Sequence, residues 1–493
     1  MSGGNAVAQA GESSEDRRLL LEVESIDLEG RGVARLDGRV IFVDDGLPGE
    51  RVVAQTVKRR GRYDRAQTLE ILRASSSRVM PPCPSYGVCG GCSMQHIDAA
   101  TQLAVKQRVL EDQLWHLARI RPDHLLAPIM GSAWNYRRRA RLSVRHVVRK
   151  GKVLVGFHER SSRYVADMLE CHVLSRRMSA LLPVLRELVA SLSIRDRIPQ
   201  IEVSEGDAYR EARGIPQAVG QSDGRAEGQV DGWSDAQPGV RHPGEDSVLA
   251  LVLRVLEYPG EADRAKLRQF AERESLELWL QPKGPDTIEL LHPERSSLGY
   301  TLDDFGLRMD FRPTDFTQVN HPMNARMVWR AIRLLDPHPG DRVLDLFCGL
   351  GNFSLPLARL SGEVLGVELS AALTGRAQDL AQRHALGSIA QFAVANLFEI
   401  AMPQWESLGE FDKALVDPPR EGAQRVCEHF ARQTNPPARI VYVSCNPATL
   451  ARDAAILVHQ GPYRLRSAGV MNMFPQTSHV ESMAVFEREG PAA

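Results

Sequence analysis

Apolar residues near the start of the chain recur in short alternating runs. Alternation with a period of two predicts strands with one buried face, and strands closely spaced by glycine turns are typical of a small β-barrel. We therefore predict an OB-like β-barrel over residues 19–77, a fold that often presents a face to RNA. The apolar runs lie at 19–23, 33–36, 40–43, 51–57 and 67–72, and the turns at 30–32, 37–38 and 46–49.

Longer and less regular segments follow the barrel. Residues 98–119 carry leucine and valine broadly at helical spacing, which predicts an amphipathic helix that could pack on the C-terminal domain. Strand-like runs and a helix near 176–192 share residues 133–206, and further strand-like runs lie at 248–255 and 276–280. These elements predict a central α+β domain over residues 78–300.

From about residue 300 onward, apolar runs alternate with helical stretches. This order is the signature of a mainly parallel, doubly wound sheet, and it predicts one α/β domain over residues 301–493. In open sheets of this kind, ligands bind at the carboxyl ends of the strands. The apolar runs lie at 342–347, 363–369, 389–395, 412–416 and 439–444.

Two segments lack the apolar clusters of a packed core. Residues 1–18 are small, polar and acidic, which predicts a disordered tail and not a secretory signal. Residues 207–246 are rich in Gly, Gln, Asp and Ser, which predicts a disordered insertion in the central domain.

The formal net charge of the 493 residues is −1, which by itself does not indicate a nucleic-acid-binding protein. The charge is segregated, however: five basic residues and one acid lie within 58–65, and eight basic residues and no acid within 137–152. One such run would favour a solvated surface, but two on separate modules indicate polyanion binding. No apolar run has the ~18 consecutive residues of a membrane span. The seven cysteines, an odd number without an export signal, predict a reducing cytoplasm with metal-bound or catalytic thiols.

The apolar run at 342–347 ends in a glycine turn, Cys348-Gly349-Leu350-Gly351-Asn352-Phe353. Glycines let a backbone approach a ligand closely, and the helix that follows offers free N–H groups. A dinucleotide site would need a third glycine where this chain has Ser354. Glu368 ends the next run and can accept hydrogen bonds from ribose hydroxyls, and Asn396 after the third run is a candidate contact to an adenine edge. We interpret the site as one for S-adenosylmethionine rather than NAD.

Cys445 follows the run at 439–444, and Asp417 begins the motif Asp417-Pro418-Pro419-Arg420 after another predicted strand. The C5 atom of uracil is a poor nucleophile toward a methyl sulfonium, but addition of a thiolate to C6 turns the ring into an enolate whose C5 can attack. A general base must then remove the C5 proton so that the thiol can leave. We predict that Cys445 is the nucleophile, that Glu481 is the base, and that Asp417 binds the flipped ring or shapes its pocket. Cys348 and Cys427 are interpreted as inert buried residues.

A second group of cysteines lies in a loop rich in Pro and Gly. Cys83, Cys89 and Cys92 are separated by five and two residues, and Cys171 is available as a fourth ligand. Zinc usually uses paired Cys-x2-Cys knuckles, whereas a tight triple with a remote fourth cysteine fits a [4Fe–4S] cluster better. The spacing alone leaves zinc as an alternative. We expect a structural or RNA-positioning role for the cluster rather than a redox role in catalysis.

Together these motifs resemble the RNA uracil-5-methyltransferase family over nearly the whole chain from about residue 20, apart from the 207–246 insertion. The barrel resembles a TRAM domain, and the cysteine loop resembles the family's iron–sulfur segment. Members that act on transfer RNA typically lack both, so the chain is most similar to the branch that methylates 23S ribosomal RNA. The resemblance implies a C-terminal class I, Rossmann-like methyltransferase domain that depends on S-adenosylmethionine. We expect a cytoplasmic monomer with 23S ribosomal RNA as its partner and no membrane association.

The resemblance also implies roles for individual residues. Cys445 would be the nucleophile and Glu481 the proton-abstracting base. The implied cofactor contacts are Gln318, Phe347, Asn352, Glu368, Asn396 and Asp417, and the implied cluster ligands are Cys83, Cys89, Cys92 and Cys171.

Three alternatives stay open at this point. The enzyme could act on transfer RNA or on a second ribosomal site, or the chain could be a non-catalytic RNA-binding assembly factor. Complete signatures at Cys445, Asp417 and Glu481 argue against the assembly factor. An adenine amino-group methyltransferase would need no cysteine and usually shows Asn/Asp-Pro-Pro-Tyr, where this chain has Arg420 in place of the tyrosine.

Overall fold

The structure is a computed structural model that describes residues 18–27, 29–207 and 247–490. The chain divides into two compact units: the first comprises residues 1–86, 92–105 and 476–478, and the second comprises residues 87–91, 106–475 and 479–493. The disordered tail and the disordered insertion predicted from the sequence lie outside the described residues, except for Arg18 and Asp207 at their edges.

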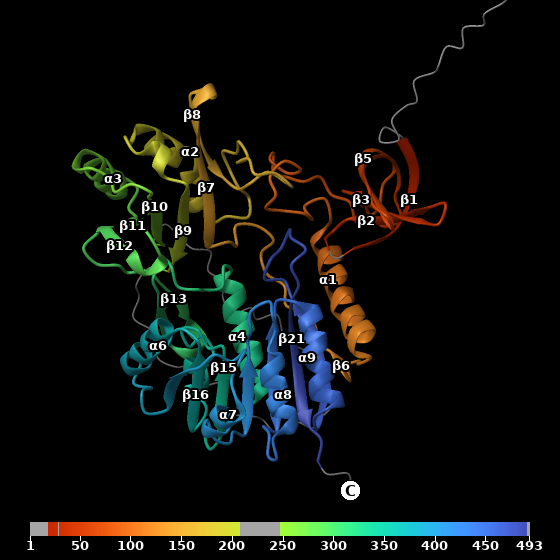
Figure 1. Ribbon diagram of the computed structural model, residues 1–493, viewed down its shortest axis with the longest axis vertical. Helices are drawn as coiled ribbons and strands as arrows, with labels where there is room; N and C mark the ends of the chain where they lie inside the picture. Colours follow the sequence, from red (N-terminus) through yellow and green to blue (C-terminus); the bar gives the residue numbers. More distant parts are fainter. Residues whose placement is uncertain (1–17, 28, 208–246, 491–493) are drawn as a thin grey trace, which may run out of the picture. The chain divides into compact units, whose positions relative to one another are not determined.

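The first unit is built around a closed barrel of five strands in the order β1-β2-β3-β5-β4, coloured red in Figure 1. The alternation in the sequence produces this barrel, because the inward-facing side chains are the apolar ones; the core consists of Leu21, Val23, Ala34, Ile41, Val43, Val52, Ala54 and Ala66. A Cβ atom at Gly32 would come within 2.7 Å of a Val23 methyl group and 2.9 Å of the Gly46 carbonyl, so β2 has to begin with glycine. The strands are β1 (Arg18–Ile26), β2 (Gly32–Leu36), β3 (Arg39–Asp44), β4 (Arg51–Arg59) and β5 (Tyr63–Arg73). The predicted barrel is confirmed.

Helix α1 (Ala99–Gln113) continues as a π-helical turn over Leu114–Ala118, close to the predicted range of 98–119. From Lys106 onward the helix belongs to the second unit. There the carbonyl of Ala118 lies 2.8 Å from Nε2 of His459, so the end of this segment is tied to the C-terminal part of the chain.

A six-stranded sheet in the order β12-β11-β10-β9-β7-β8 forms the central part of the second unit. The helix predicted near 176–192 is α2 (Arg176–Ser191), and its N-cap Ser175 accepts a hydrogen bond from the backbone N–H of Met178. Helix α3 (Glu261–Arg273) follows β10, and the short strands β13 (Gly299–Leu302) and β14 (Leu307–Asp310) form a separate pair. The sheet strands are β7 (Arg139–Val147), β8 (Lys152–Gly156), β9 (Gln200–Gly206), β10 (Val248–Arg254), β11 (Glu277–Gln281) and β12 (Glu289–His292).

An eight-stranded sheet in the order β17-β16-β15-β18-β19-β21-β20-β6 forms the C-terminal part of the second unit. The strands from β17 to β19 are parallel, which confirms the doubly wound sheet predicted from the sequence. The chain order reverses between β15 and β18, the point at which such sheets bind ligands. The strands are β15 (Arg342–Leu346), β16 (Glu363–Glu368), β17 (Ala390–Val394), β18 (Lys413–Val416), β19 (Arg439–Ser444), β20 (Tyr463–Met471), β21 (Glu481–Arg488) and β6 (His124–Leu125).

Helices cover both faces of this sheet, as the alternating side chains of β19 show. Val441 and Val443 face a core shared with α4 (His321–Leu335), α5 (Ser354–Ala358) and α6 (Ala371–Arg383). Tyr442 points the other way and donates a hydrogen bond of 2.7 Å to Asp453 of α9. The helices of the second face are α7 (Met402–Ser407), α8 (Gln424–Arg432) and α9 (Pro447–His459), and α8 and α9 lie side by side in Figure 1. Within the described ranges, no helix is both long and apolar enough to cross a bilayer.

Candidate active site

Five of the predicted site residues gather at one edge of the eight-stranded sheet. They end or follow the parallel strands β15 to β19, and the carboxyl ends of parallel strands meet at the same edge. The five are Phe347, Glu368, Asn396, Asp417 and Cys445. The sheet topology therefore brings together the glycine turn, the Asp-Pro-Pro-Arg turn and the candidate nucleophile.

The glycine turn after β15 borders open space. Gly349 and Gly351 have φ values of 55° and 83°, in the left-handed region that favours glycine. The N–H groups of Phe347 and Cys348 both donate to the carbonyl of Val367, at 2.9 and 3.1 Å, which ties the turn to β16. A Cβ atom at Gly349 would meet nothing within 4 Å, so a ligand can approach the backbone closely there.

A carboxylate and an exposed ring stand beside this turn. The Glu368 carboxylate accepts hydrogen bonds from Gly349 N, at 3.3 Å, and from Ser370 N, at 2.9 Å. The ring of Phe398 is 42% exposed, and its centroid lies 5.5 Å from that of Phe347. Asn396 holds Phe398 in place by accepting a hydrogen bond of 3.1 Å from its N–H. An acceptor for ribose hydroxyls and an aromatic surface for a base suit the nucleoside half of S-adenosylmethionine.

Cys445 occupies a tight turn between β19 and α9 and is half-buried. The next residue, Asn446, caps α9 by accepting a hydrogen bond of 3.1 Å from Ala448 N, and its amide donates to the carbonyl of Arg420 at 3.1 Å. The Thr449 hydroxyl donates to the same carbonyl at 3.2 Å. The turn that carries the thiol is therefore fixed to the loop that begins with Asp417.

Glu481 lies opposite Cys445 on the neighbouring strand. The antiparallel register of β19 and β21 pairs Ser444 with Ser482, so the next pair outward is Cys445 with Glu481. Directly opposed residues of an antiparallel pair point to the same side of a sheet, with Cα atoms about 4.5–5.5 Å apart. Glu481 is 3% exposed, so its carboxyl group is shielded from solvent.

Burial and like charges raise the pKa values of all three reactive groups. Burial and the charge of Asp417 raise the pKa of Glu481 to about 8. Burial and the charge of Asp345 raise the pKa of Asp417 to about 7. Burial, Glu481 and Asp417 together raise the pKa of the Cys445 thiol to about 12, and Arg420 opposes this shift. The thiol is therefore protonated in the free site, while Glu481 titrates near neutral pH, where a general base works best.

The sequence reasoning did not single out Lys106, a lysine that lies among these groups. Lys106 of α1 is 1% exposed, and its ammonium group donates hydrogen bonds to Asn472 Oδ1 at 2.9 Å and to the carbonyl of Phe474 at 2.8 Å. Its charge lowers the pKa of Glu481. The sequence did hold a signal, because Lys106 falls on the apolar stripe of its helix between Leu103 and Leu110.

The remaining predicted cofactor contacts, Asn352 and Gln318, lie nearby. The Asn352 amide exchanges two hydrogen bonds of 2.9 Å with Asn324 and accepts a third from the Tyr300 hydroxyl. Gln318 is half-buried and lies two residues before Asn320, whose amide donates to the carbonyl of Met473 at 3.1 Å. That bond joins the Gln318 loop to the segment between β20 and β21.

The other cysteines fall into two groups. Cys348 and Cys427 are buried, and burial raises the pKa of each thiol well above its usual range, which agrees with an inert role. Of the predicted cluster ligands, Cys83 and Cys92 belong to the first unit, and Cys89 and Cys171 to the second.

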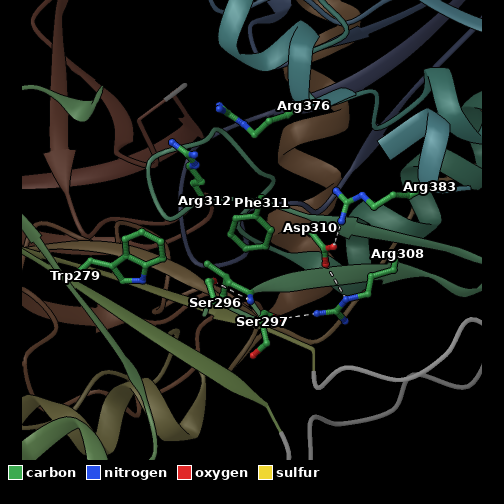
Figure 2. A pocket seen from close by; sticks show the side chains of 10 residues that line it. Trp279, Ser296, Ser297, Arg308, Asp310, Phe311, Arg312, Arg376 and Arg383 are labelled. Atoms are coloured by element: carbon green, nitrogen blue, oxygen red, sulfur yellow. Dashed lines mark hydrogen bonds and ion pairs between the residues drawn. The ribbon is translucent and has the colours of Figure 1, made fainter. Parts of the chain in front are cut away.

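A cavity of about 400 Å³ in the second unit is lined by four arginines and one aspartate, as Figure 2 shows. Arg308 and Arg383 both pair with Asp310, at 2.8 and 2.6 Å. Arg376 pairs with Asp315, which also accepts a hydrogen bond of 2.8 Å from the N–H of Arg312. The lining residues are Trp279, Ser296, Ser297, Leu298, Arg308, Asp310, Phe311, Arg312, Arg376 and Arg383. The excess of positive charge suits an anionic ligand, and the segment that includes Arg312 runs on into the Gln318 loop.

Comparison with known proteins points to one family. Residues 300–489 match the model of the tRNA (Uracil-5-)-methyltransferase family. The chain is 52% identical over 484 residues to the 23S rRNA (uracil(1939)-C(5))-methyltransferase RlmD of Burkholderia pseudomallei, with 96% of both chains covered. It is 53% identical over 471 residues to the protein of the same name from Bordetella bronchiseptica, covering 95% of this chain and 93% of the relative. The protein of that name from Cupriavidus metallidurans is 51% identical over 481 residues, with 95% of both chains covered.

A solved structure shares the fold. The Pyrococcus abyssi tRNA (uracil-54, C5)-methyltransferase in complex with S-adenosyl-L-homocysteine aligns with 95% of this chain and 100% of its own, with a TM-score of 0.67 and 21% identity. The much higher identity to the bacterial relatives, over nearly the whole length of both chains, decides the family. The chain belongs to the RNA uracil-C5 methyltransferase family, in the branch of the 23S rRNA (uracil-C5)-methyltransferases.

Proposed function

We propose that this protein transfers a methyl group from S-adenosylmethionine to C5 of one uridine in 23S ribosomal RNA. The observation that carries the proposal is the β19–β21 register, which pairs Cys445 with Glu481 at the sheet edge that also carries the glycine turn. The relatives that cover nearly the whole chain support the choice of RNA, and their names give the position as uracil 1939. We propose the corresponding uridine as the target.

The chemistry follows from the placement of the two side chains. The uridine leaves its stack so that its ring can reach the half-buried thiol. The Cys445 thiol first releases its proton to solvent. The thiolate then forms a bond to C6, and the electron pair of the C5=C6 double bond moves through the ring to O4 as an enolate. When bound, S-adenosylmethionine would supply an electrophilic methyl group to C5, and its sulfur would keep the electrons of the broken S–methyl bond and leave as S-adenosylhomocysteine. Glu481 then removes the C5 proton, the double bond forms again, and the S–C6 bond breaks to release the thiolate.

The residues around the glycine turn fit the cofactor. Glu368 offers its carboxylate to ribose hydroxyls, and Phe347 and Phe398 offer ring surface to adenine beside the open backbone of Gly349. We propose Gln318, Asn352, Asn396 and Asp417 as further contacts, as their motifs suggest. Asp417 follows β18, which lies between β15 and β19 in the sheet, and this order supports the proposal that Asp417 contacts both cofactor and uracil.

Positive charge in each unit supports an RNA substrate. In the first unit, the basic residues within 58–65 lie at the exposed junction of β4 and β5. In the second unit, the arginine cavity offers donors that suit phosphate oxygens. We propose that both contact the RNA backbone, which positions the substrate without reading its sequence.

Purified protein with labelled S-adenosylmethionine is expected to place one 5-methyluridine in unmodified 23S ribosomal RNA and none in transfer RNA. Mass spectrometry of nuclease fragments locates the product, and a transcript with cytidine at the proposed position serves as the control. The same nucleotide should lack its methyl group in cells without the protein. Methylation of transfer RNA, or of a different ribosomal uridine, would replace the proposed substrate with one of the alternatives.

We also propose that Cys83, Cys89, Cys92 and Cys171 bind a [4Fe–4S] cluster. The support is the tight triple of thiols in the sequence together with the family resemblance. In the part of the chain that the structure describes, no group of three or more His, Cys, Asp or Glu side chains is arranged to hold a metal ion, so the proposal rests on the sequence. The cluster would stabilise its loop or position RNA.

Protein purified without oxygen is expected to be brown and to contain iron and acid-labile sulfide. Cys83→Ala should lose both, whereas Cys427→Ala should keep them, because Cys427 is a buried residue of α8 with no proposed ligand role. Colourless protein that contains zinc would overturn the iron–sulfur assignment.

Three further features remain proposals. The domains would be a TRAM barrel over residues 19–77, a central domain over 78–300 and a methyltransferase domain over 301–493. The protein would act as a monomer in the cytoplasm, where its ribosomal RNA substrate is made.

A further inference from the structure

Lys106 is a fully buried amine whose hydrogen-bond acceptors are both neutral. Its ammonium group donates to Asn472 Oδ1 at 2.9 Å and to the carbonyl of Phe474 at 2.8 Å. Burying a cation is costly unless an anion compensates it. The polar groups that accept its hydrogen bonds do not supply that charge, so only a nearby anion can favour its ammonium form.

Glu481 is the carboxyl group whose charge acts on Lys106. The register of β20 and β21 pairs Met471 with Glu481, so Asn472, which Lys106 binds, follows directly after the partner of Glu481. Lys106 and Glu481 favour each other's charged form. The other charged groups that act on Glu481 are Asp417, which opposes its ionisation, and Arg420, which favours it.

Lys106 and Glu481 compete for a proton near neutral pH. Burial lowers the pKa of Lys106 to about 7, and burial with Asp417 raises the pKa of Glu481 to about 8. Glu481 can accept a proton only as a carboxylate, and near neutral pH the ammonium form of Lys106 favours that state. The same ammonium group lies near His479, whose pKa it lowers together with Arg420 and Arg137 after the larger effect of burial.

Resting on the proposed function, we propose that Lys106 is a positioning residue for proton removal from C5 of the methylated uracil. Its hydrogen bonds hold the 472–474 segment that precedes β21, and its positive charge favours the carboxylate form of Glu481. The proton balance is simple: Glu481 accepts the C5 proton, the electron pair of the C–H bond restores C5=C6, and the Cys445 sulfur leaves with the electrons of the S–C6 bond. Lys106 acts through Glu481 in this proposal and not by contact with the ring or the cofactor.

The test is the pH dependence of turnover in Lys106→Met and Lys106→Gln. Loss of the cation raises the pKa of Glu481, so the acidic limb of the rate profile should move to higher pH by about one unit. At a given pH below the midpoint, the rate of the variant should then be about tenfold lower than that of the parent. At low pH the Cys445–uracil adduct should accumulate, and at high pH turnover should recover. Lys106→Gln retains hydrogen-bond donors without the charge, so it should show the same shift even if Lys106→Met folds poorly.

The control is Lys266→Met, which removes an exposed lysine of α3 that donates to the Ser191 carbonyl. It should leave the profile unchanged. Turnover that falls evenly at every pH in both Lys106 variants, or a profile identical to that of the parent, overturns the proposal. An inactive parent enzyme on 23S ribosomal RNA would instead refute the proposed function, so the two failures are distinguishable.

Discussion

Cys445→Ala is expected to abolish methyl transfer and to leave RNA binding close to normal. Without the sulfur, C6 gains no substituent, and C5 keeps too little electron density to attack a methyl sulfonium. We expect a loss of at least about a thousandfold, the scale seen when a nucleophile is removed from an enzyme. Transfer from labelled S-adenosylmethionine measures the first effect, and a gel-shift titration with the same RNA measures the second.

Cys427→Ala is the matched control. Cys427 belongs to α8 and is buried, and burial raises the pKa of its thiol well above the usual range. Its loss should leave transfer nearly unchanged, which separates the removal of one particular nucleophile from the removal of any thiol. Substantial transfer by Cys445→Ala would show that the methylation proceeds without this covalent step.

The barrel and the parallel sheet could be predicted because each rests on a local pattern. Leu21 and Val23 alternate with polar residues, and this period of two by itself determines which face of β1 is buried. The runs that became β15, β18 and β19 are buried on both faces after their first residue, as strands covered by helices on two faces must be. The edge position of Asp417 and Cys445 then follows from the topology rule for open sheets.

The relation between Cys445 and Glu481 could not be predicted in the same way. It depends on β21 entering the sheet antiparallel between β19 and β20, so that a strand from the end of the chain lies beside β19. A shift of one residue would turn Glu481 to the opposite face of the sheet. The sequence motif suggested the role of Glu481, whereas the register of β19 and β21 determines where its side chain lies.

The role of Lys106 and the arginine cavity could not be predicted from the sequence for a second reason. Lys106 reaches the site from α1, far from β21 in the sequence, and a lysine on an apolar helix face has no short-range partner to reveal its role. The cavity gathers Trp279, Arg312 and Arg383 from three separate segments. Each of these side chains by itself looks like ordinary surface or core, and only the packing of the second unit assembles them.

Glu481→Gln is expected to stop the reaction after methylation and to trap the RNA on the enzyme. The amide keeps the shape of the carboxyl group but cannot accept the C5 proton, so the Cys445–C6 bond cannot break. Because Glu481 is buried, solvent is a poor substitute for the missing base. The adduct should resist denaturing gels, and its mass after nuclease digestion should equal protein plus methylated nucleotide.

Glu487→Gln is the control for this trap, because Glu487 lies on the same strand and pairs instead with Arg439 and Arg466, at 2.7 and 2.8 Å. It should give no adduct, and adding Cys445→Ala to Glu481→Gln should abolish the adduct altogether. Rapid turnover by Glu481→Gln would show that another group acts as the base, and Asp417 would be the next carboxyl group to test. The dependence on pH distinguishes the base, Glu481, from the positioning residue, Lys106. Glu481→Gln should trap RNA at every pH, whereas a Lys106 variant should trap it only where Glu481 is protonated.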